Sequence, residues 1–351
     1  MKENGHLLKL RIGNIQKTNL IEKGISTLLL EPLFVCAIKR YFSHVKFDLV
    51  LYSTPPVTLV SAIEYIKKRD KAKTYLMLKD IFPQNAVDMG MLHTNGIKSL
   101  IYQYFRRKEK KLYSISDKIG CMSPANINYI LQHNPEVPSY KVELCPNCIE
   151  FCNLSLTPAE RITMRKKYKI PLDKIVFVYG GNLGRPQSIP FLTKCLQTQQ
   201  QNHDAFFLIV GDGTEYGQLA TYFRDIAPDN MKLMQRMPKN DYDRMIAACD
   251  VGMIFLDHNF TIPNFPSRIL SYMQAGLPII ACTDTSSDVG NMIAGGNFGW
   301  WCESNRAENF AVCVEEAMAS DIPSKGQNAL NYLLQNYTTT EVYKNVKDFS
   351  A

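Results

Sequence analysis

Two short segments in the second half of the sequence contain residue types that suit an anionic ligand. The segment from Gly180 to Arg185 follows an apolar run, and its glycines let the backbone approach a ligand closely while Arg185 could meet a phosphate. The segment Pro266-Ser267-Arg268 opens a predicted helix over residues 269–275, whose free N–H groups and positive dipole end attract anions. Each segment also has a plainer interpretation, a tight turn for the first and helix capping beside a solvated charge for the second.

The elements that would position these segments are strands of parallel sheets. Short apolar runs rich in Val, Ile, Phe and Tyr alternate with amphipathic segments of helical length. Predicted strands cover residues 47–53, 74–80, 118–123 and 141–145, and then 175–181, 205–211, 231–236, 251–257 and 278–284. Such continuous runs are typical of parallel strands buried on both faces, and ligands of these sheets bind beyond the carboxyl ends of the strands. For the segment Gly211-Asp212-Gly213, at one such end, a turn without a ligand is the favoured interpretation over a binding loop.

The strand–helix alternation is interrupted between residues 150 and 173, which indicates a domain boundary. We predict an α/β protein with two Rossmann-like domains, residues 1–150 and residues 151–351. The second domain is expected to close with a helix near residues 329–336.

Composition limits the kinds of partner. The chain has 351 residues, of which 46% are hydrophobic and 21% charged, as in soluble globular proteins. The formal net charge of +7 suits an anionic small molecule or an anionic membrane surface and does not argue for nucleic acid. No secretory signal opens the sequence, and the apolar stretch from Ile25 to Ile38 is interrupted by Glu31 and Pro32, so a cytoplasmic protein is expected.

Ten cysteines are spread along the chain and are expected to be reduced thiols. Cys145, Cys148 and Cys152 have the spacing of three metal ligands, which leaves a zinc or iron–sulfur site open. No fourth ligand stands nearby in the sequence, and a structural zinc site needs four. We therefore favour a buried strand end and its following loop, and predict no metal.

The order of these motifs resembles one enzyme family. FVYGGNLGRPQSI, FLIVGDGTEYGQL and PSRILSYMQAGLPIIA are similar to the first strand and loop, the second strand and the donor-binding helix of retaining GT-B glycosyltransferases. KDIFPQNAVDMGML resembles their Asp-x-Trp-Pro segment, with Phe82 in place of Trp, and YSISDKIGCMSP and CPNCIE resemble the segments that close the first domain. The match covers residue 47 to the end and is to the family 4-like branch that builds bacterial capsules and O-antigens.

The resemblance implies a GT-B fold and an activity. The chain would transfer a hexosyl or related group from a nucleotide sugar to a lipid-linked or polysaccharide acceptor in cell-surface polysaccharide biosynthesis. The nucleotide sugar would be a co-substrate, and no cofactor would be needed. Asp80 stands where an Asp or His of the family faces the reacting sugar, which makes it the candidate catalytic residue. The residues implicated in donor binding are Gly181, Asn182, Gly184, Arg185, Phe265, Pro266, Ser267, Arg268 and Ser271.

The sequence departs from the family pattern in the donor domain. Many relatives carry two Glu residues across the donor helix, where this chain has Pro263 and Ser271. Many also carry an Arg and a Lys in the first donor loop, where this chain has Asn182 and Gln187. Arg185 and Arg268 would then stabilise the departing diphosphate. Two alternatives stay open, a non-catalytic nucleotide-sugar-binding relative and a GT-B sugar-nucleotide epimerase, which would need a carboxylate or His cluster beside the donor sugar.

The amino-terminal part is expected to be incomplete relative to the family. A domain of this family begins with a strand and a Gly-rich loop, whereas residues 7–12 resemble a later strand. About fifty residues, the length of one or two βα units, would be missing.

The segment from Lys98 to Lys111 contains three aromatic residues, followed by five basic residues between positions 106 and 111. A basic amphipathic helix of this kind could lie on an anionic membrane surface. A connecting helix with a solvated charged face explains the pattern equally well. Because enzymes of the family often act on lipid-linked sugars, a peripheral contact with the inner face of the plasma membrane is favoured.

Overall fold

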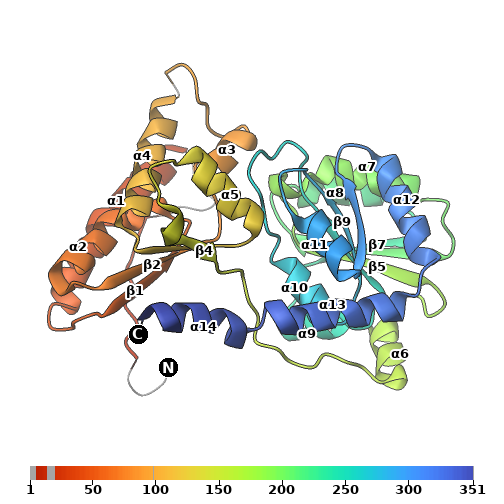
Figure 1. The fold of residues 1–351 in the computed structure, drawn as a ribbon. Coiled ribbons are helices and arrows are strands. Elements are labelled where there is room, and N and C mark those ends of the chain that lie inside the picture. Colours follow the sequence, from red (N-terminus) through yellow and green to blue (C-terminus); the bar gives the residue numbers. More distant parts are fainter. Residues whose placement is uncertain (1–4, 14–19, 98, 351) are drawn as a thin grey trace. The chain divides into compact units, whose positions relative to one another are not determined.

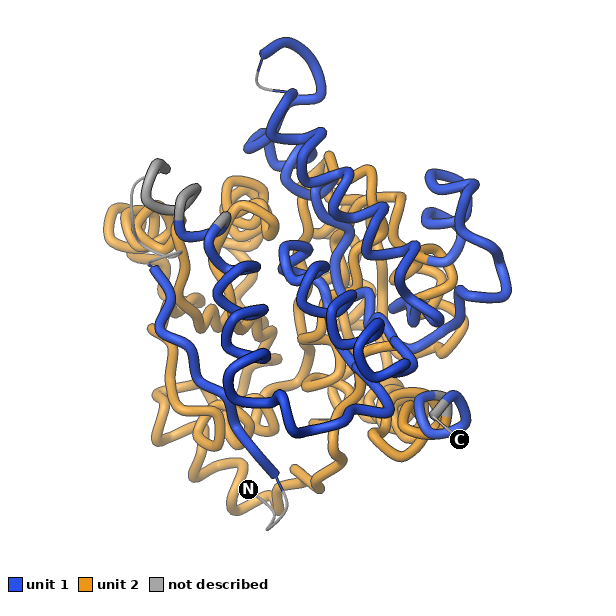
Figure 2. Tube along the Cα trace, turned by 90° about the vertical axis from the view of Figure 1, so that its left-hand side faces the viewer, with its two compact units in different colours: residues 1–122, 127–145, 346–351 blue, residues 123–126, 146–345 orange. Residues whose placement is uncertain are grey.

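The computed structural model describes residues 5–13, 20–97 and 99–350, which form two compact units (Figures 1 and 2). Unit 1 comprises residues 1–122, 127–145 and 346–351, and unit 2 comprises residues 123–126 and 146–345. Apart from the short segment of residues 123–126, the chain passes from unit 1 into unit 2 between Cys145 and Pro146 and returns to unit 1 at its end.

Unit 1 contains a parallel sheet of four strands in the order β1-β2-β3-β4. Its strands are β1 (Leu49–Ser53), β2 (Lys73–Leu78), β3 (Lys118–Cys121) and β4 (Val142–Leu144). Its helices are α1 (Leu20–Tyr41), α2 (Val60–Asp70), α3 (Gln84–Asp88), α4 (Ser99–Ile115) and α5 (Pro124–His133), the last of which begins in the part assigned to unit 2. All four strands coincide with predicted ones.

The amino-terminal segment differs from its prediction. Residues 7–12 form no strand: Leu7 is 62% exposed, and Leu8 packs against the apolar cluster around Ile38 and Ile66 without pairing to the sheet. The apolar stretch from Ile25 to Ile38 lies in α1, a helix of 22 residues that contains Pro32 and that the sequence analysis did not assign. Among the described helices, none combines the length and the apolar character needed to cross a membrane.

Unit 2 contains a parallel sheet of six strands in the order β10-β9-β8-β5-β6-β7. Its strands are β5 (Ile175–Asn182), β6 (Ala205–Asp212), β7 (Met231–Gln235), β8 (Val251–Phe255), β9 (Ile279–Thr283) and β10 (Gly299–Glu303). Its helices are α6 (Pro158–Lys167), α7 (Ile189–Thr198), α8 (Tyr216–Ile226), α9 (Lys239–Ile246), α10 (Arg268–Gln274), α11 (Val289–Gly296), α12 (Ala307–Met318), α13 (Ile322–Asn336) and α14 (Thr339–Ser350), whose last residues join unit 1.

The two faces of this sheet carry separate apolar clusters, which explains the continuous apolar runs in the sequence. Phe177 and Phe207 point into one cluster, where their rings stack with centroids 5.1 Å apart. Val176 and Val178, the neighbours of Phe177 on β5, point into the other. Because a strand directs alternate side chains to opposite faces, β5 must be apolar at every buried position. The strand order places β5 between β6 and β8, at the centre of the sheet.

Candidate functional site

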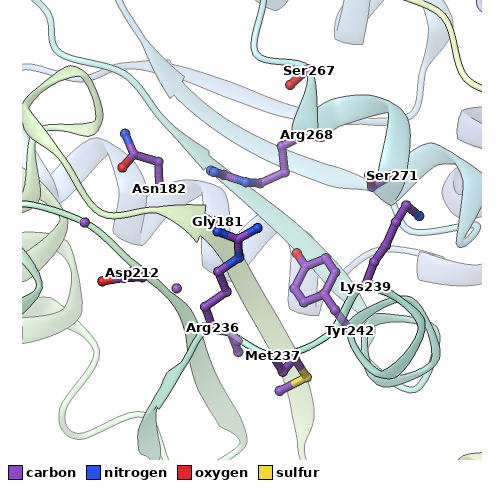
Figure 3. A pocket seen from close by; sticks show the side chains of 14 residues that line it. Gly181, Asn182, Asp212, Arg236, Met237, Lys239, Tyr242, Ser267, Arg268 and Ser271 are labelled. Carbon is purple, nitrogen blue, oxygen red and sulfur yellow. The ribbon is translucent and has the colours of Figure 1, made fainter. Parts of the chain in front are cut away.

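A cavity of about 640 Å³ opens at the carboxyl ends of β5, β6 and β7 in unit 2. Its volume is within the range of small-molecule sites, and its position is the one expected for a ligand of an open parallel sheet. Figure 3 shows the side chains around it. The residues that line it are Gly180, Gly181, Asn182, Val210, Gly211, Asp212, Gly213, Arg236, Met237, Lys239, Tyr242, Ser267, Arg268 and Ser271.

Glycines bring the backbone of β5 and β6 together at this cavity. A Cβ atom on Gly211 would lie 2.0 Å from the carbonyl oxygen of Gly181, and one on Gly213 would lie 2.3 Å from the carbonyl oxygen of Leu183. Gly181 has φ +125°, and a Cβ there would lie 2.0 Å from a terminal nitrogen of Arg268. These three positions exclude larger residues, and at Gly181 the missing side chain makes room for the guanidinium group.

Aromatic rings, and not carboxylates, hold Arg268. The guanidinium carbon lies 4.4 Å from the ring centroid of Tyr179, which is a cation–π contact. Within the described part of the chain, Arg268 forms no ion pair with a carboxylate, and the groups that act on its charge are Tyr179, Tyr242 and Tyr272. Its positive charge is therefore not neutralised within the protein and is available to an anion in the cavity.

The three tyrosines also fix the end of β5. The N–H of Gly180 donates to the hydroxyl of Tyr272 at 3.0 Å, and the hydroxyl of Tyr179 donates to the carbonyl of Asn182 at 2.6 Å. The hydroxyl of Tyr242 is buried and has no hydrogen-bond partner of ordinary geometry among the described residues. Burial raises the pKa of Tyr242 to about 12, so this hydroxyl keeps its proton at neutral pH and could donate it to a ligand oxygen.

Two further cations line the cavity from the β7 side. Arg236 follows β7 directly and forms no ion pair among the described residues. Lys239 begins α9 and is paired with Asp243 on the same helix. Figure 3 shows the side chains of Arg236, Tyr242 and Arg268 converging on the space beside Gly181. The lining includes one acidic residue, Asp212, which is exposed, so positive charge dominates the site.

The structure brings together five of the predicted donor-binding residues, Gly181, Asn182, Ser267, Arg268 and Ser271. The other four, Gly184, Arg185, Phe265 and Pro266, do not line this cavity. Arg185 is exposed at the start of a short 3₁₀ turn (η3, Arg185–Gln187), and the ring of Phe265 packs against Tyr337 with centroids 5.6 Å apart. The side-chain amide of Asn182 donates to Gln187 at 2.8 Å, so the two positions that depart from the family pattern bond to each other.

Sequence reasoning missed Arg236, Lys239 and Tyr242, and for Gly211-Asp212-Gly213 it favoured a turn without a ligand. All of these line the cavity. The signal that could have found Arg236 is its position directly after β7, since a residue there faces the same edge of the sheet as the β5 loop.

The helix that carries Arg268 begins and ends one residue before the predicted range of 269–275. α10 starts at Arg268, and Pro266 lies before it. Ser267 is the N-cap residue, but its side chain makes no capping hydrogen bond, so its hydroxyl stays free to bind a ligand. Gly276 has φ +68° and follows the helix, with its N–H donating to the carbonyl of Met273 at 3.0 Å and the N–H of Leu277 donating to the carbonyl of Tyr272 at 3.0 Å. This is a Schellman closure.

Asp80, the candidate catalytic residue, belongs to unit 1 and lies just beyond the carboxyl end of β2. Its carboxylate accepts a hydrogen bond of 2.5 Å from the side-chain amide of Asn85, and its carbonyl accepts one of 2.9 Å from the hydroxyl of Thr54. Burial raises the pKa of Asp80 to about 6, against the hydrogen bond from Asn85, which favours the ionised form. The carboxylate is thus held in one orientation and can exchange a proton close to neutral pH.

The cysteine motif forms no ligand set in the described structure, where no three His, Cys, Asp or Glu side chains are grouped as metal ligands would be. Cys145 is buried beside Gly120, where a Cβ atom would lie 2.4 Å from that of Cys145. Cys152 bonds to Gln274 instead, its N–H donating to the side-chain oxygen at 3.3 Å.

Two α/β units with parallel sheets, one of them with a cationic cavity at its strand ends, define the GT-B class of fold. Residues 160–332, which lie within unit 2, match the model of the family Glycosyl transferases group 1. A probable glycosyltransferase of Pseudomonas aeruginosa, WbjE, is 25% identical over 337 residues, which are 95% of this chain and 81% of that protein.

A putative colanic acid biosynthesis glycosyl transferase of Escherichia coli K12, WcaI, is 20% identical over 274 residues, which are 77% of this chain and 63% of that protein. Among solved structures, Anabaena HepE in complex with UDP and glucose superposes with a TM-score of 0.72 at 14% identity, covering 92% of this chain and 82% of HepE. This structural likeness supports the GT-B fold of both units.

Proposed function

We propose that this chain transfers a sugar from a nucleotide-sugar donor, which it binds in the cavity of unit 2. The observation that carries the proposal is the pair Arg236 and Arg268, which face one glycine-lined cavity without carboxylate partners among the described residues. The guanidinium of Arg268 is partly buried, where an uncompensated charge is costly, and an anionic ligand would compensate it, while the exposed Arg236 would add a second positive charge. A diphosphate has the charge to do so, and the exposed backbone of Gly181 could approach it.

The same arrangement could assist the chemical step. When a glycosyl bond to a diphosphate breaks, negative charge develops on the leaving oxygen, and fixed cations stabilise that charge. Relatives of the family often place an Arg and a Lys in the loop after β5, where this chain has the neutral pair Asn182 and Gln187. We infer that Arg236, from the end of β7, together with Arg268 takes over their function. No metal ion is needed in this account, because the protein supplies the positive charge.

Asp80 is the proposed catalytic residue of unit 1. Its support is the position after β2, the orientation imposed by Asn85 and a pKa raised to about 6. At neutral pH the carboxylate is mostly ionised, and it could bind a hydroxyl of the reacting sugar or stabilise positive charge on its ring. Retention of the anomeric configuration, which the family resemblance implies, is part of the same proposal.

The acceptor is proposed to be a lipid-linked glycan or a growing polysaccharide on the cytoplasmic side of the membrane. The name of WcaI, which refers to colanic acid biosynthesis, supports a polysaccharide pathway. The complex of HepE with UDP and glucose makes UDP the first nucleotide to test.

The test is calorimetric titration of the full chain with UDP and with GDP, followed by incubation with the sugar nucleotides of whichever binds. Binding of one nucleotide and release of its sugar are expected, and the anomeric configuration of the product reports retention. Binding without release would favour the non-catalytic alternative, and conversion of the donor sugar to an epimer would favour the epimerase. If neither nucleotide binds, the proposal is wrong.

A further inference from the structure

An apolar projection extends from unit 1 at the start of α4. The loop after α3 and the first turn of α4 protrude from the rest of unit 1 in both views (Figures 1 and 2). Ile97, Leu100 and Ile101 are 89%, 64% and 54% exposed, and the half-buried Tyr104 continues their helical spacing. These four residues, called the apolar tip below, form one stripe that unit 1 does not cover.

The tip stands on a rigid base. Further along α4 the ring of Phe105 packs edge-on against Phe82, with centroids 5.0 Å apart. Leu112 and Tyr113 are fully buried, and the hydroxyl of Tyr113 donates to the buried carboxylate of Glu109 at 2.7 Å. Leu100, Ile101 and Tyr104 therefore lie on a helix whose later turns are anchored by packing in unit 1, and Ile97 lies in the turn that precedes this helix.

The charges of α4 do not form the basic face that its sequence suggested. Most of its cations are paired within unit 1, as Arg106 with Glu109 at 2.5 Å, Lys108 with Glu31, Lys110 with Glu136 at 3.0 Å and Lys111 with Glu64. Arg107 is the exception on the described part of the helix, since it is exposed and forms no ion pair. It continues the spacing of Leu100 and Tyr104, at the base of the tip.

The surroundings of the tip favour one class of partner. No Asp or Glu occurs between Asp88 and Glu109, a segment that contains Lys98 and Arg107. A convex aliphatic stripe needs no matching pocket when it enters a fluid layer of acyl chains, and a cation at its base can meet lipid phosphates. We propose that the apolar tip inserts into the interface of an anionic lipid bilayer, with Arg107 at the level of the headgroups. The proposal deepens the proposed function and rests on it only for the lipid-linked nature of the acceptor.

The test is co-sedimentation of the full chain with vesicles of phosphatidylcholine alone and of phosphatidylcholine and phosphatidylglycerol in equal parts. The wild-type chain should bind the anionic vesicles. The double variant I97N/I101N should bind them at least tenfold more weakly, because about tenfold is expected for each aliphatic side chain withdrawn from the interface. R107Q should weaken binding to anionic vesicles and leave binding to neutral ones unchanged.

Matched controls separate this surface from general hydrophobicity. Leu172 and Val312 are 51% and 52% exposed in unit 2, and L172N/V312N should bind vesicles like the wild type. All variants should bind nucleotide as the wild type does. A loss of nucleotide binding would therefore count against the donor site and not against the apolar tip. Wild-type sedimentation that is no greater than without lipid, or unchanged binding by I97N/I101N, overturns the proposal. A dimer in light scattering that I97N/I101N abolishes would overturn it in favour of self-association.

Discussion

At the residue scale, the central feature is an arginine whose charge is held by aromatic rings. A carboxylate partner would compete with an anionic ligand, whereas the ring of Tyr179 orients Arg268 and leaves its charge available. The same arrangement can therefore bind a diphosphate in the ground state and stabilise it as it leaves.

Removing this charge should weaken nucleotide binding. R268A is expected to raise the Kd for the nucleoside diphosphate by about ten- to a hundredfold, which corresponds to the ~1.5–3 kcal/mol of a hydrogen bond to a charged group. Calorimetry measures the change, and R224A is the control, because Arg224 is an exposed arginine paired with Asp225 outside the cavity. An unchanged Kd for R268A would remove this residue from the donor site.

Gly181 should be sensitive to the smallest enlargement. In G181A the new Cβ would lie 2.0 Å from a nitrogen of Arg268, at a φ of +125° that L-residues rarely adopt. We expect a loss of about 1–3 kcal/mol in the free energy of unfolding and a weaker affinity for nucleotide, because the guanidinium must move. Chemical denaturation and calorimetry test both effects. G295A is the control, since Gly295 lies outside the cavity and a Cβ atom there would meet no atom within 4 Å.

The raised pKa of Asp80 predicts that the free energy of unfolding depends on pH. Its pKa rises from 3.8 in the unfolded chain to about 6, so ionisation is less favourable in the folded state. The cost is absent below pH 3.8, grows between 3.8 and about 6, and is complete above that range. D80N removes it, so the variant should gain stability over the wild type as the pH rises through this window. Equal differences in melting temperature on both sides of the window would contradict the raised pKa.

At the element scale, the ends of the elements, more than their interiors, make the site. The glycines at the ends of β5 and β6 lie against each other. The first residue of α10 is Arg268, which lines the cavity, and the helix ends in the Schellman turn at Gly276. Continuous apolar runs allowed the prediction of β5, β6, β8 and β9, because both faces of these strands are buried. β10 was not predicted, since it is the edge strand and its burial alternates.

Two glycines with open space around them separate backbone strain from packing. Gly276 has φ +68° and Gly217 lies in the first turn of α8, and a Cβ on either would meet no atom within 4 Å. G276A should cost about 1 kcal/mol because alanine is strained in the left-handed region. G217A should stabilise by about 0.5–1 kcal/mol because alanine lowers the entropy of the unfolded chain. Thermal unfolding of both variants tests the pair, and changes of the same sign would contradict the assignment.

At the scale of the whole molecule, the sequence predicted more of the fold than of the site. The α/β class with two parallel sheets was confirmed. It could be predicted because the apolar runs that mark buried strands are local features of the sequence. Arg236 and Tyr242 were missed because their place beside Gly181 depends on the order of strands in the sheet, where β7 is next to β6 and β6 next to β5. The order of the strands along the sequence does not show which strands are neighbours in the sheet. The strand predicted at residues 7–12 is absent, because this segment places Leu8 against an apolar cluster but pairs with no strand of the sheet.

The decisive measurement is the release of free nucleoside diphosphate from UDP- and GDP-sugars in the presence of EDTA. We expect the full chain to release the nucleotide from at least one donor without a divalent metal. We also expect R236M/R268M to lower this rate by about a hundredfold or more, the usual effect of removing a group that stabilises developing charge. No release from any of these donors, or release that EDTA abolishes and magnesium or manganese restores, would contradict the account.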